Sequence, residues 1–164
     1  MNPEPLASPP GVPLAPLTWD DTAAQLAASE NYLLSTAAAD GRPHVVPVLG
    51  LWLDDVLYFN TARSARKART LAANPRIAAT VAGTRADLVV EGTAEVVRQA
   101  ETLERVAAAF PGKYPWWHPF VSGGEFYDPA DTAMSDPRLV FAIAPEVVYA
   151  FAKEKGFSAT RWRP

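Results

Sequence analysis

The chain contains no cysteine and only two histidines, His44 and His118. The absence of cysteine excludes disulfides, thiol nucleophiles and cysteine-ligated metal sites, and two histidines are too few for a histidine-rich metal centre. No apolar run approaches the roughly 18 residues needed to cross a bilayer, and no basic segment followed by an apolar one predicts a signal peptide. The sequence therefore predicts a cytoplasmic protein with no bound metal and no membrane contact.

An excess of one charge sign is also absent, since the chain has 15 basic and 18 acidic residues and a net charge of −3. Bulk attraction to nucleic acid is not expected at this balance, so any basic patch must be local. The motif GxGxxG is missing, which argues against a Rossmann dinucleotide site, and GxSxG is missing, which weakens hydrolase interpretations. The length of 164 residues and the hydrophobic content of 49% suit one globular domain.

Proline is concentrated at the N-terminus, where residues 1–16 hold six of the 16 prolines. With little charge and little apolar bulk, this arm is predicted to be extended and disordered. The alternative is an arm that docks on a partner subunit. The domain itself is predicted to span residues 17–164.

Apolar periodicity and turn residues predict a mainly β fold with short helices. The acidic start after Thr18 favours a helix over 18–29, and further helices are predicted over 64–73 and 99–110. Strands are predicted over 31–38, 42–53, 56–60, 76–82, 87–97 and 139–151, with a bulge at Gly92 and a bend at Pro145, and residues 111–137 are predicted to be irregular. Strands joined mostly by short turns favour an antiparallel β-barrel.

The most informative local feature is the helix that begins near Ser64, because Arg66 and Lys67 fall in its first turn. A helix start carries a partial positive charge and normally takes acidic residues there. Basic residues at this position are explained if an anion binds, and phosphate is the usual one. A cap from Ser64 or Thr61 would leave backbone N–H groups free for it. The alternative is a solvated helix end without a ligand.

The strand before this helix contains a proline, Pro47, in a run that otherwise predicts a position inside the sheet. Proline removes a hydrogen-bond donor from the ladder. A barrel that opens at one seam to admit a flat ring would tolerate this loss. An edge strand or a bulge with no ligand is the alternative.

Four segments in order, DGRPHVVPV, LYFNT, RKARTLAANPRIA and DLVVEGTAEVV, resemble the split β-barrel flavin and deazaflavin oxidoreductase superfamily, whose members are similar to pyridoxamine 5′-phosphate oxidase. The tail GFSATRWRP is similar to the ending FSxTRWRF of the branch that uses the deazaflavin coenzyme F420. The resemblance implies a split antiparallel β-barrel of the FMN-binding type, assembled as a homodimer. It implies coenzyme F420 as the cofactor, with FMN as the alternative.

The resemblance also implies which residues bind the cofactor. Arg66 and Lys67 would hold its phosphate, and the strand from His44 to Val48 would run along its ring. The C-terminal tail would close over the ring. The full set of implied cofactor-binding residues is His44, Val45, Val46, Pro47, Val48, Asn60, Thr61, Arg66, Lys67, Val81, Asp87, Arg161 and Trp162.

Two positions depart from the pattern of the oxidase itself. Gly50 stands near the place of an expected lysine, and Ala65 replaces a phosphate-binding serine. Oxidation of pyridoxine phosphate is therefore not expected.

The loop that carries Trp116, Trp117 and His118 is a candidate substrate wall, since adjacent indoles offer a flat apolar surface and the imidazole a polar group. The alternative is that these residues close the barrel end or pack at a dimer contact.

Together these features predict an oxidoreductase that transfers a hydride between F420 and an electron-poor small molecule. An FMN-dependent enzyme and a non-catalytic flavin- or tetrapyrrole-binding protein are the alternatives. No side chain is assigned as catalytic.

Overall fold

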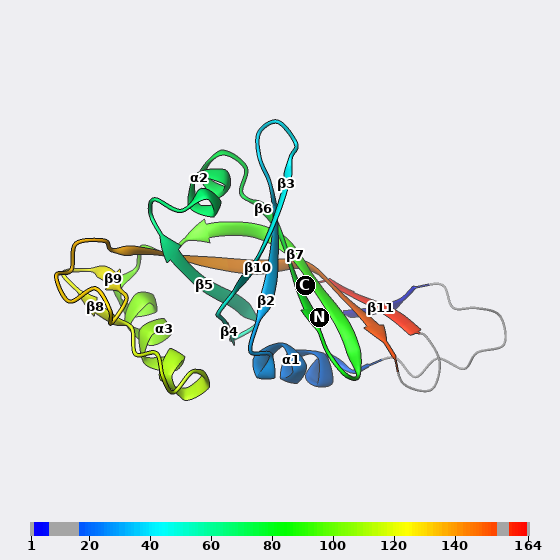
Figure 1. Cartoon of the computed structure of the whole chain (residues 1–164). Coiled ribbons are helices and arrows are strands. Elements are labelled where there is room, and N and C mark those ends of the chain that lie inside the picture. The colour runs from blue at the N-terminus through cyan, green and yellow to red at the C-terminus, as the bar shows by residue number, and fades with distance from the viewer. Residues whose placement is uncertain (1, 7–16, 154–157, 164) are drawn as a thin grey trace.

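The computed structural model describes residues 2–6, 17–153 and 158–163, which form three helices and eleven strands (Figure 1). The helices are α1 (Trp19–Ala28), α2 (Arg66–Ala73) and α3 (Ala100–Lys113). The strands are β1 (Asn2–Pro5), β2 (Tyr32–Ala37), β3 (Pro43–Val48), β4 (Gly50–Leu53), β5 (Val56–Ala62), β6 (Arg76–Ala82), β7 (Ala86–Val96), β8 (Phe120–Ser122), β9 (Glu125–Tyr127), β10 (Arg138–Ala152) and β11 (Ser158–Arg163).

All strand pairs are antiparallel, and the long strand β10 organises them. The main path runs β1-β11-β10-β7-β6-β2-β3, while the first half of β10 also pairs with β5, which in turn pairs with β4. Helices α1 and α2 lie on opposite sides of the strands, and α3 lies with β8 and β9 at one end (Figure 1). The predicted fold class, a mainly β antiparallel split barrel, is confirmed.

The local turn chemistry explains several element boundaries. Thr18 caps α1 by accepting a hydrogen bond from the Asp21 amide. Asp54 and Asp55 both have positive φ, as a two-residue hairpin between β4 and β5 requires. The residue before Pro75 is pushed out of helical geometry, and α2 accordingly ends at Ala73.

Two predicted details of the strands are wrong. Residues 42–53 do not form one strand, because β3 pairs with β2 and β4 pairs with β5, so the chain changes partners at Leu49. The bulge lies in β10 between Pro145 and Val147 and not at Gly92, which faces it. A Cβ on Gly92 would come 2.6 Å from the Ala144 carbonyl oxygen, so the glycine allows close approach of the bulged strand.

The segment predicted to be irregular contains unpredicted structure. Helix α3 continues through Pro111 to Lys113, beyond the predicted end at residue 110. A short hairpin then follows, in which β8 pairs with β9 around Gly123 and Gly124, both at positive φ. Strand β9 joins the start of β10 through the pair Arg138 and Phe126. The hairpin therefore attaches this segment to the main sheet.

Two hydrophobic clusters stabilise the fold. The larger one packs α1 and the sheet around Tyr32, Phe59 and Trp162. The smaller one packs α3 against β4, β5 and β9 around Phe110, with Trp117 in edge-to-face contact at a ring distance of 4.6 Å. The predicted apolar face of α3, which is Leu103, Val106, Ala107 and Phe110, is buried there.

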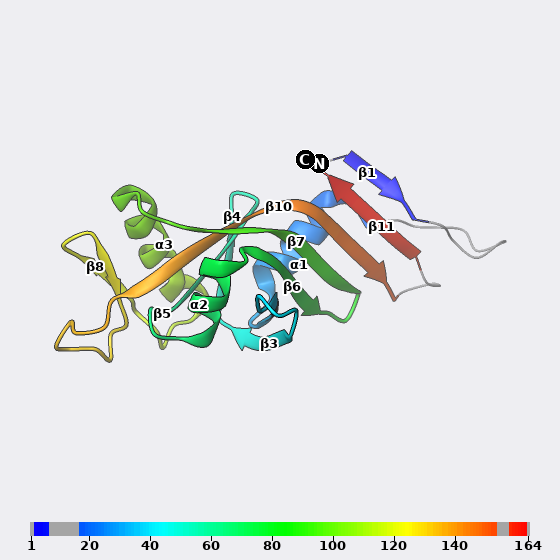
Figure 2. The same ribbon diagram turned by 90° about the horizontal axis from the view of Figure 1, so that it is seen from above.

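The described start of the proline-rich arm forms a strand. Asn2–Pro5 forms β1, which pairs with β11 at the edge of the sheet (Figure 2). Glu4 forms an ion pair with Arg161 across this pairing. An extended proline-containing segment suits an edge strand, since only one side must hydrogen-bond. Residues 7–16 of the predicted arm lie outside the described residues.

Candidate functional site

A cleft of about 550 Å³ lies between the end of β3, the end of β5, the start of α2 and the loops around α3 and β9. It brings together six of the residues predicted for the site. These are Pro47, Val48, Asn60, Lys67, Trp116 and Trp117. Leu49, Asp128, Pro129, Ala130 and Arg138, which sequence reasoning missed, complete its lining.

Arg138 is the structural centre of the polar side of this cleft. Its Nε donates to Asn60 Oδ1 at 2.6 Å, and one terminal nitrogen lies 3.1 Å from the Asp128 carboxylate. Both members of the ion pair are 27% exposed, and Asn60 is buried. In the ladder Arg138 faces Ala62 and Val140 faces Asn60, so Arg138 and Asn60 are diagonal neighbours on one face.

Lys67 provides the free positive charge of the cleft. Burial lowers the pKa of Lys67 below its usual value, and the nearby charge of Arg138 lowers it further. Among the described residues no carboxylate pairs with its ammonium. Two cations on one cleft wall repel each other, and an anion bound between them would relieve that repulsion.

Helix α2 begins at the same wall with open backbone donors. Its N-cap is Ala65, which makes no side-chain hydrogen bond to the helix, and its first turn contains no acidic residue. The predicted caps, Ser64 or Thr61, are therefore wrong. A helix start without a side-chain cap leaves amide N–H groups for an anion or for water.

The two tryptophans of the predicted substrate wall differ in their surroundings. Trp117 is buried against Phe110 and Phe126, so it belongs to the smaller hydrophobic cluster as well as to the cleft. Trp116 is 69% exposed at the rim. His118 does not line the cleft, and its Nε2 lies 2.8 Å from the Pro115 carbonyl oxygen. The cleft therefore has one fixed indole and one exposed indole.

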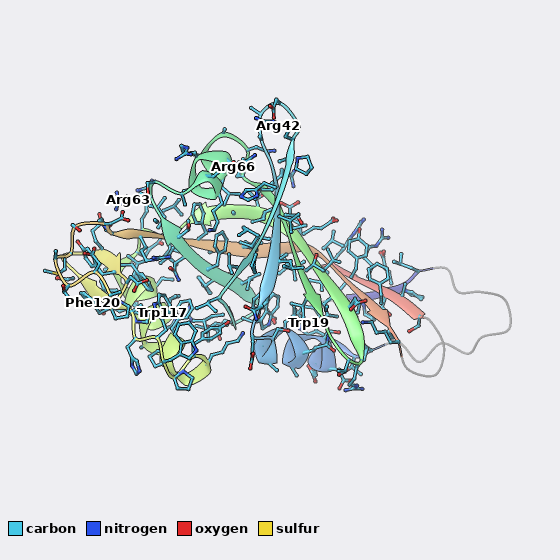
Figure 3. All side chains as sticks on the ribbon, in the orientation of Figure 1. Trp19, Arg42, Arg63, Arg66, Trp117 and Phe120 are labelled. Carbon is cyan, nitrogen blue, oxygen red and sulfur yellow. The ribbon has the colours of Figure 1, made fainter. Side chains whose placement is uncertain are left out.

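The structure separates Arg66 from Lys67. Arg66 is exposed and outside the cleft lining. The pKa of Asp40 in the turn between β2 and β3 is lowered first by hydrogen bonds from Arg42 and also by the charge of Arg66. Figure 3 shows Arg66 beside α2 and near Arg42, away from Trp117. Of the predicted basic pair, Lys67 therefore lines the cleft, whereas Arg66 lies toward the turn between β2 and β3.

The other cofactor residues predicted in the body of the domain also lie outside the lining of this cleft. His44, Val45 and Val46 precede the part of β3 that reaches it, and Thr61 is buried beside Asn60. Val81 is in the core, and Asp87 pairs with Lys153 at 2.6 Å.

The tail residues are not brought to the cleft either. Trp162 is 1% exposed and packs on Trp19 at a ring distance of 5.9 Å. Arg161 pairs with Glu4. Successive side chains of a strand point to opposite faces of the sheet, so the pairing of β11 with β10 places the Trp162 side chain on the core face.

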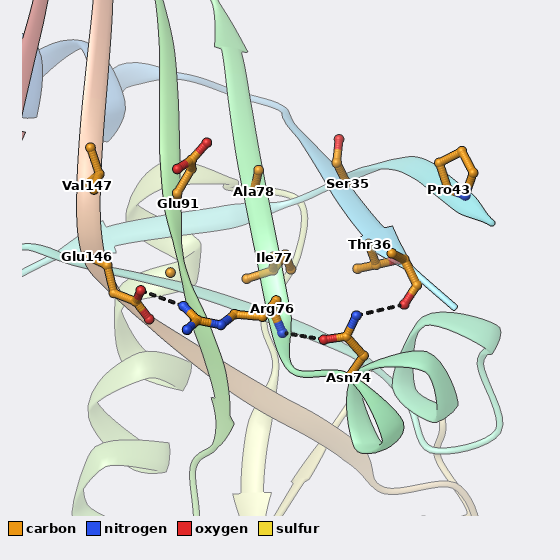
Figure 4. Close-up of a pocket in the computed structure, with 12 residues that line it drawn as sticks. Ser35, Thr36, Pro43, Asn74, Arg76, Ile77, Ala78, Glu91, Glu146 and Val147 are labelled. Carbon is orange, nitrogen blue, oxygen red and sulfur yellow. Dashed lines mark hydrogen bonds and ion pairs between the residues drawn. The ribbon is translucent and has the colours of Figure 1, made fainter. Parts of the chain in front are cut away.

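A second cavity of about 430 Å³ lies on the open face of β2, β6, β7 and β10 (Figure 4). Arg76 forms an ion pair with Glu146 there at 2.6 Å, and its backbone N–H donates to Asn74 Oδ1. Glu146 also accepts from the Thr93 hydroxyl at 2.7 Å. The basic side chain of this cavity is therefore already neutralised, unlike Lys67.

Within the described ranges, no three His, Asp or Glu residues are arranged to hold a metal ion. No helix of the described residues is both long and apolar enough to span a bilayer. The donor set of the cleft instead fits a flat organic phosphate. Lys67 and the α2 start offer positive charge and free N–H groups, whereas the charge of Arg138 is paired with Asp128, and Val48 with the two indoles offers apolar surface.

The sequence model of the family described as pyridoxamine 5′-phosphate oxidase matches residues 19–152 of the chain. The chain belongs to this family. Among curated proteins none matches the chain.

Three solved structures illustrate the shared fold. The conserved hypothetical protein Rv2991 of Mycobacterium tuberculosis is 22% identical with a TM-score of 0.68, and the match covers 85% of this chain and 87% of that one. An F420 reductase is 24% identical with a TM-score of 0.58, covering 76% of this chain and 93% of that one. An FAD-binding protein of Mesorhizobium loti is 22% identical with a TM-score of 0.58, covering 89% of this chain and 96% of that one. These similarities establish the fold.

Proposed function

We propose that the protein is an oxidoreductase that binds coenzyme F420 in the cleft beside Lys67 and Arg138. The observation that carries the proposal is the unpaired, half-buried Lys67 ammonium at an uncapped helix start, next to a flat apolar wall. Membership of a family that includes flavin- and deazaflavin-dependent proteins supports this cofactor class. The similarity of the tail to the F420 branch favours F420 over FMN.

Each cleft residue has a distinct role in this proposal. Lys67 and the first amides of α2 bind the phosphate, and Arg138 keeps Asn60 and Asp128 in fixed positions around it. The backbone of Pro47 and Val48 lies along the ring, and Trp117 excludes water from one end. Hydride transfer to an electron-poor double bond is the chemistry that this cofactor class supplies when bound. The protein supplies orientation and charge.

We further propose that the protein is a homodimer, as the family resemblance implies. Leu33 and Val45 are 43% and 55% exposed on neighbouring strands, and Pro47 lies opposite Leu33 on the same face. β3 is also the last strand of the sheet path. An exposed apolar face at a sheet edge favours burial against a second copy. Light scattering after gel filtration measures the mass, and Val45→Lys should shift it toward the monomer.

Titration of the purified protein with F420 and, separately, with FMN tests the cofactor. Lys67→Ala should weaken F420 binding roughly tenfold or more, because a hydrogen bond to a charged group contributes about 1.5–3 kcal/mol. Arg66→Ala is the matched control, since it removes the same charge from the same helix turn but outside the cleft. Unchanged affinity in Lys67→Ala would place the phosphate elsewhere, and equal losses in both variants would show that Arg66 contributes as much as Lys67.

The same titrations separate the alternatives. Tight FMN binding without F420 binding would replace the proposal by an FMN-dependent enzyme. F420 binding without reduction of any quinone, enone or nitroaromatic acceptor would favour a carrier protein that binds the cofactor without turnover.

A further inference from the structure

A smaller cavity of about 340 Å³ adjoins the cleft at the end of α3. Leu49 and Trp116 line both spaces, so they form the wall between them. The remaining lining includes Glu30, Lys113 and Tyr114. Its volume is at the lower end of the range for small-molecule sites. No predicted cofactor residue lies in it.

Lys113 is the basic group of this cavity and has only neutral partners among the described residues. Its Nζ donates to the Gly50 carbonyl oxygen at 2.9 Å and to the Tyr32 hydroxyl oxygen at 3.2 Å. The ammonium lies 4.9 Å from the centre of the Tyr32 ring and 5.6 Å from that of Tyr114. An ammonium has three N–H donors, and these contacts use two. One donor remains for a ligand.

The cation is also uncompensated by any acidic partner. Burial alone lowers the pKa of Lys113 to about 8, and no carboxylate of the described residues lies within ion-pair distance of it. Lys153 shows the usual arrangement, since it pairs with Asp87 at 2.6 Å. Tyr32 and Tyr114 face Lys113 but stay neutral, because burial raises the pKa of both hydroxyls. A carboxylate from outside would supply the missing counter-charge.

We propose that this cavity is a binding subsite for the carboxylate of a planar aromatic molecule. The carboxylate accepts from Lys113, and the aromatic ring lies on Trp116 and Leu49. Glu30 lines the same cavity, so its negative charge would disfavour a second negative charge on the ligand. The preferred ligand is therefore a monocarboxylate. The subsite needs no cofactor, so its test is independent of the oxidoreductase proposal.

The test compares 2-naphthoate with 2-naphthamide, its neutral analogue of nearly the same shape. Calorimetric titration of the full chain at pH 7 should show roughly tenfold tighter binding of the naphthoate. The binding free energy of an ion pair in a partly exposed site lies between that of a surface pair and that of a buried pair. Lys113→Met should abolish this preference while leaving naphthamide binding nearly unchanged. Lys113→Arg should retain it.

Two further arms keep the test informative if Lys113→Met fails to fold. Glu30→Gln removes a repelling charge but leaves the Glu30 carbonyl that accepts from Tyr114, so naphthoate should bind a few-fold tighter. Raising the pH from 7 to 9.5 should remove most of the wild-type preference, because Lys113 loses its proton, but not that of Lys113→Arg.

The proposal is overturned if the wild type binds neither probe or binds both equally. Retention of the preference in Lys113→Met would place the carboxylate on another cation. An equal loss of both probes in that variant would assign Lys113 a purely structural role at Gly50.

Discussion

Arg138→Met offers the sharpest test of the architecture of the cleft. The substitution removes the 2.6 Å hydrogen bond to Asn60 and the 3.1 Å ion pair with Asp128. The buried Asn60 oxygen then loses this hydrogen-bond donor. The Asp128 carboxylate, which is only 27% exposed, loses its ion-pair partner. Charged hydrogen bonds contribute about 1.5–3 kcal/mol, and partial exposure reduces the value. We expect the free energy of unfolding to fall by about 2 kcal/mol.

Urea unfolding at constant m-value measures this loss. Arg76→Met is the matched control, because its pair with Glu146 is much more exposed, at 69% and 49%, and should contribute less than about 1 kcal/mol. NMR titration gives a second readout, since loss of the Arg138 charge should raise the pKa of Lys67. An unchanged urea midpoint for Arg138→Met, or equal losses in both variants, would refute the reasoning.

Three further predictions concern the fold. Gly92→Ala should destabilise by about 1–3 kcal/mol in urea unfolding, because the new Cβ meets the Ala144 carbonyl oxygen, and an unchanged midpoint would disprove this packing. Trp162→Ala should lower the free energy of unfolding by about 3–5 kcal/mol, since the indole is buried against Trp19. A normal urea midpoint together with weakened F420 binding would instead support the predicted closure of the tail over the cofactor ring. Because the fold lowers the pKa of Lys113 from 10.5 to about 8, the unfolded chain binds more protons between these values, so wild-type stability should rise from pH 8 to 10 relative to Lys113→Met. Parallel pH profiles of the two proteins would contradict it.

The elements were largely predictable because their signals are local. The Thr18 cap, the Asp54-Asp55 turn and the proline after α2 each act within a few residues of the chain. Helix α3 was predicted from its buried face. The hairpin β8–β9 was missed because its strands are three residues each, too short to show alternation. Its double glycine was the available signal.

The site was predictable only in part, since side-chain direction depends on packing. Arg66 and Lys67 are equivalent in the sequence, but successive helix residues differ by about 100° in direction, so only Lys67 reaches the cleft. The tail motif resembles one branch of the family, and the cofactor hypothesis rests on that resemblance. It could not indicate that Trp162 enters the core.

The sequence by itself determined most of the strand and helix positions, the family and the basic start of α2, because these depend on neighbouring residues. Tertiary structure alone decided which polar groups meet. Arg138 joins Asn60 across 78 positions of the chain through the pairing of β10 with β5. Lys113 reaches Gly50 across 63 positions because α3 packs beside the break between β3 and β4. Contacts at such separations come from strand register and helix packing, which no local pattern encodes.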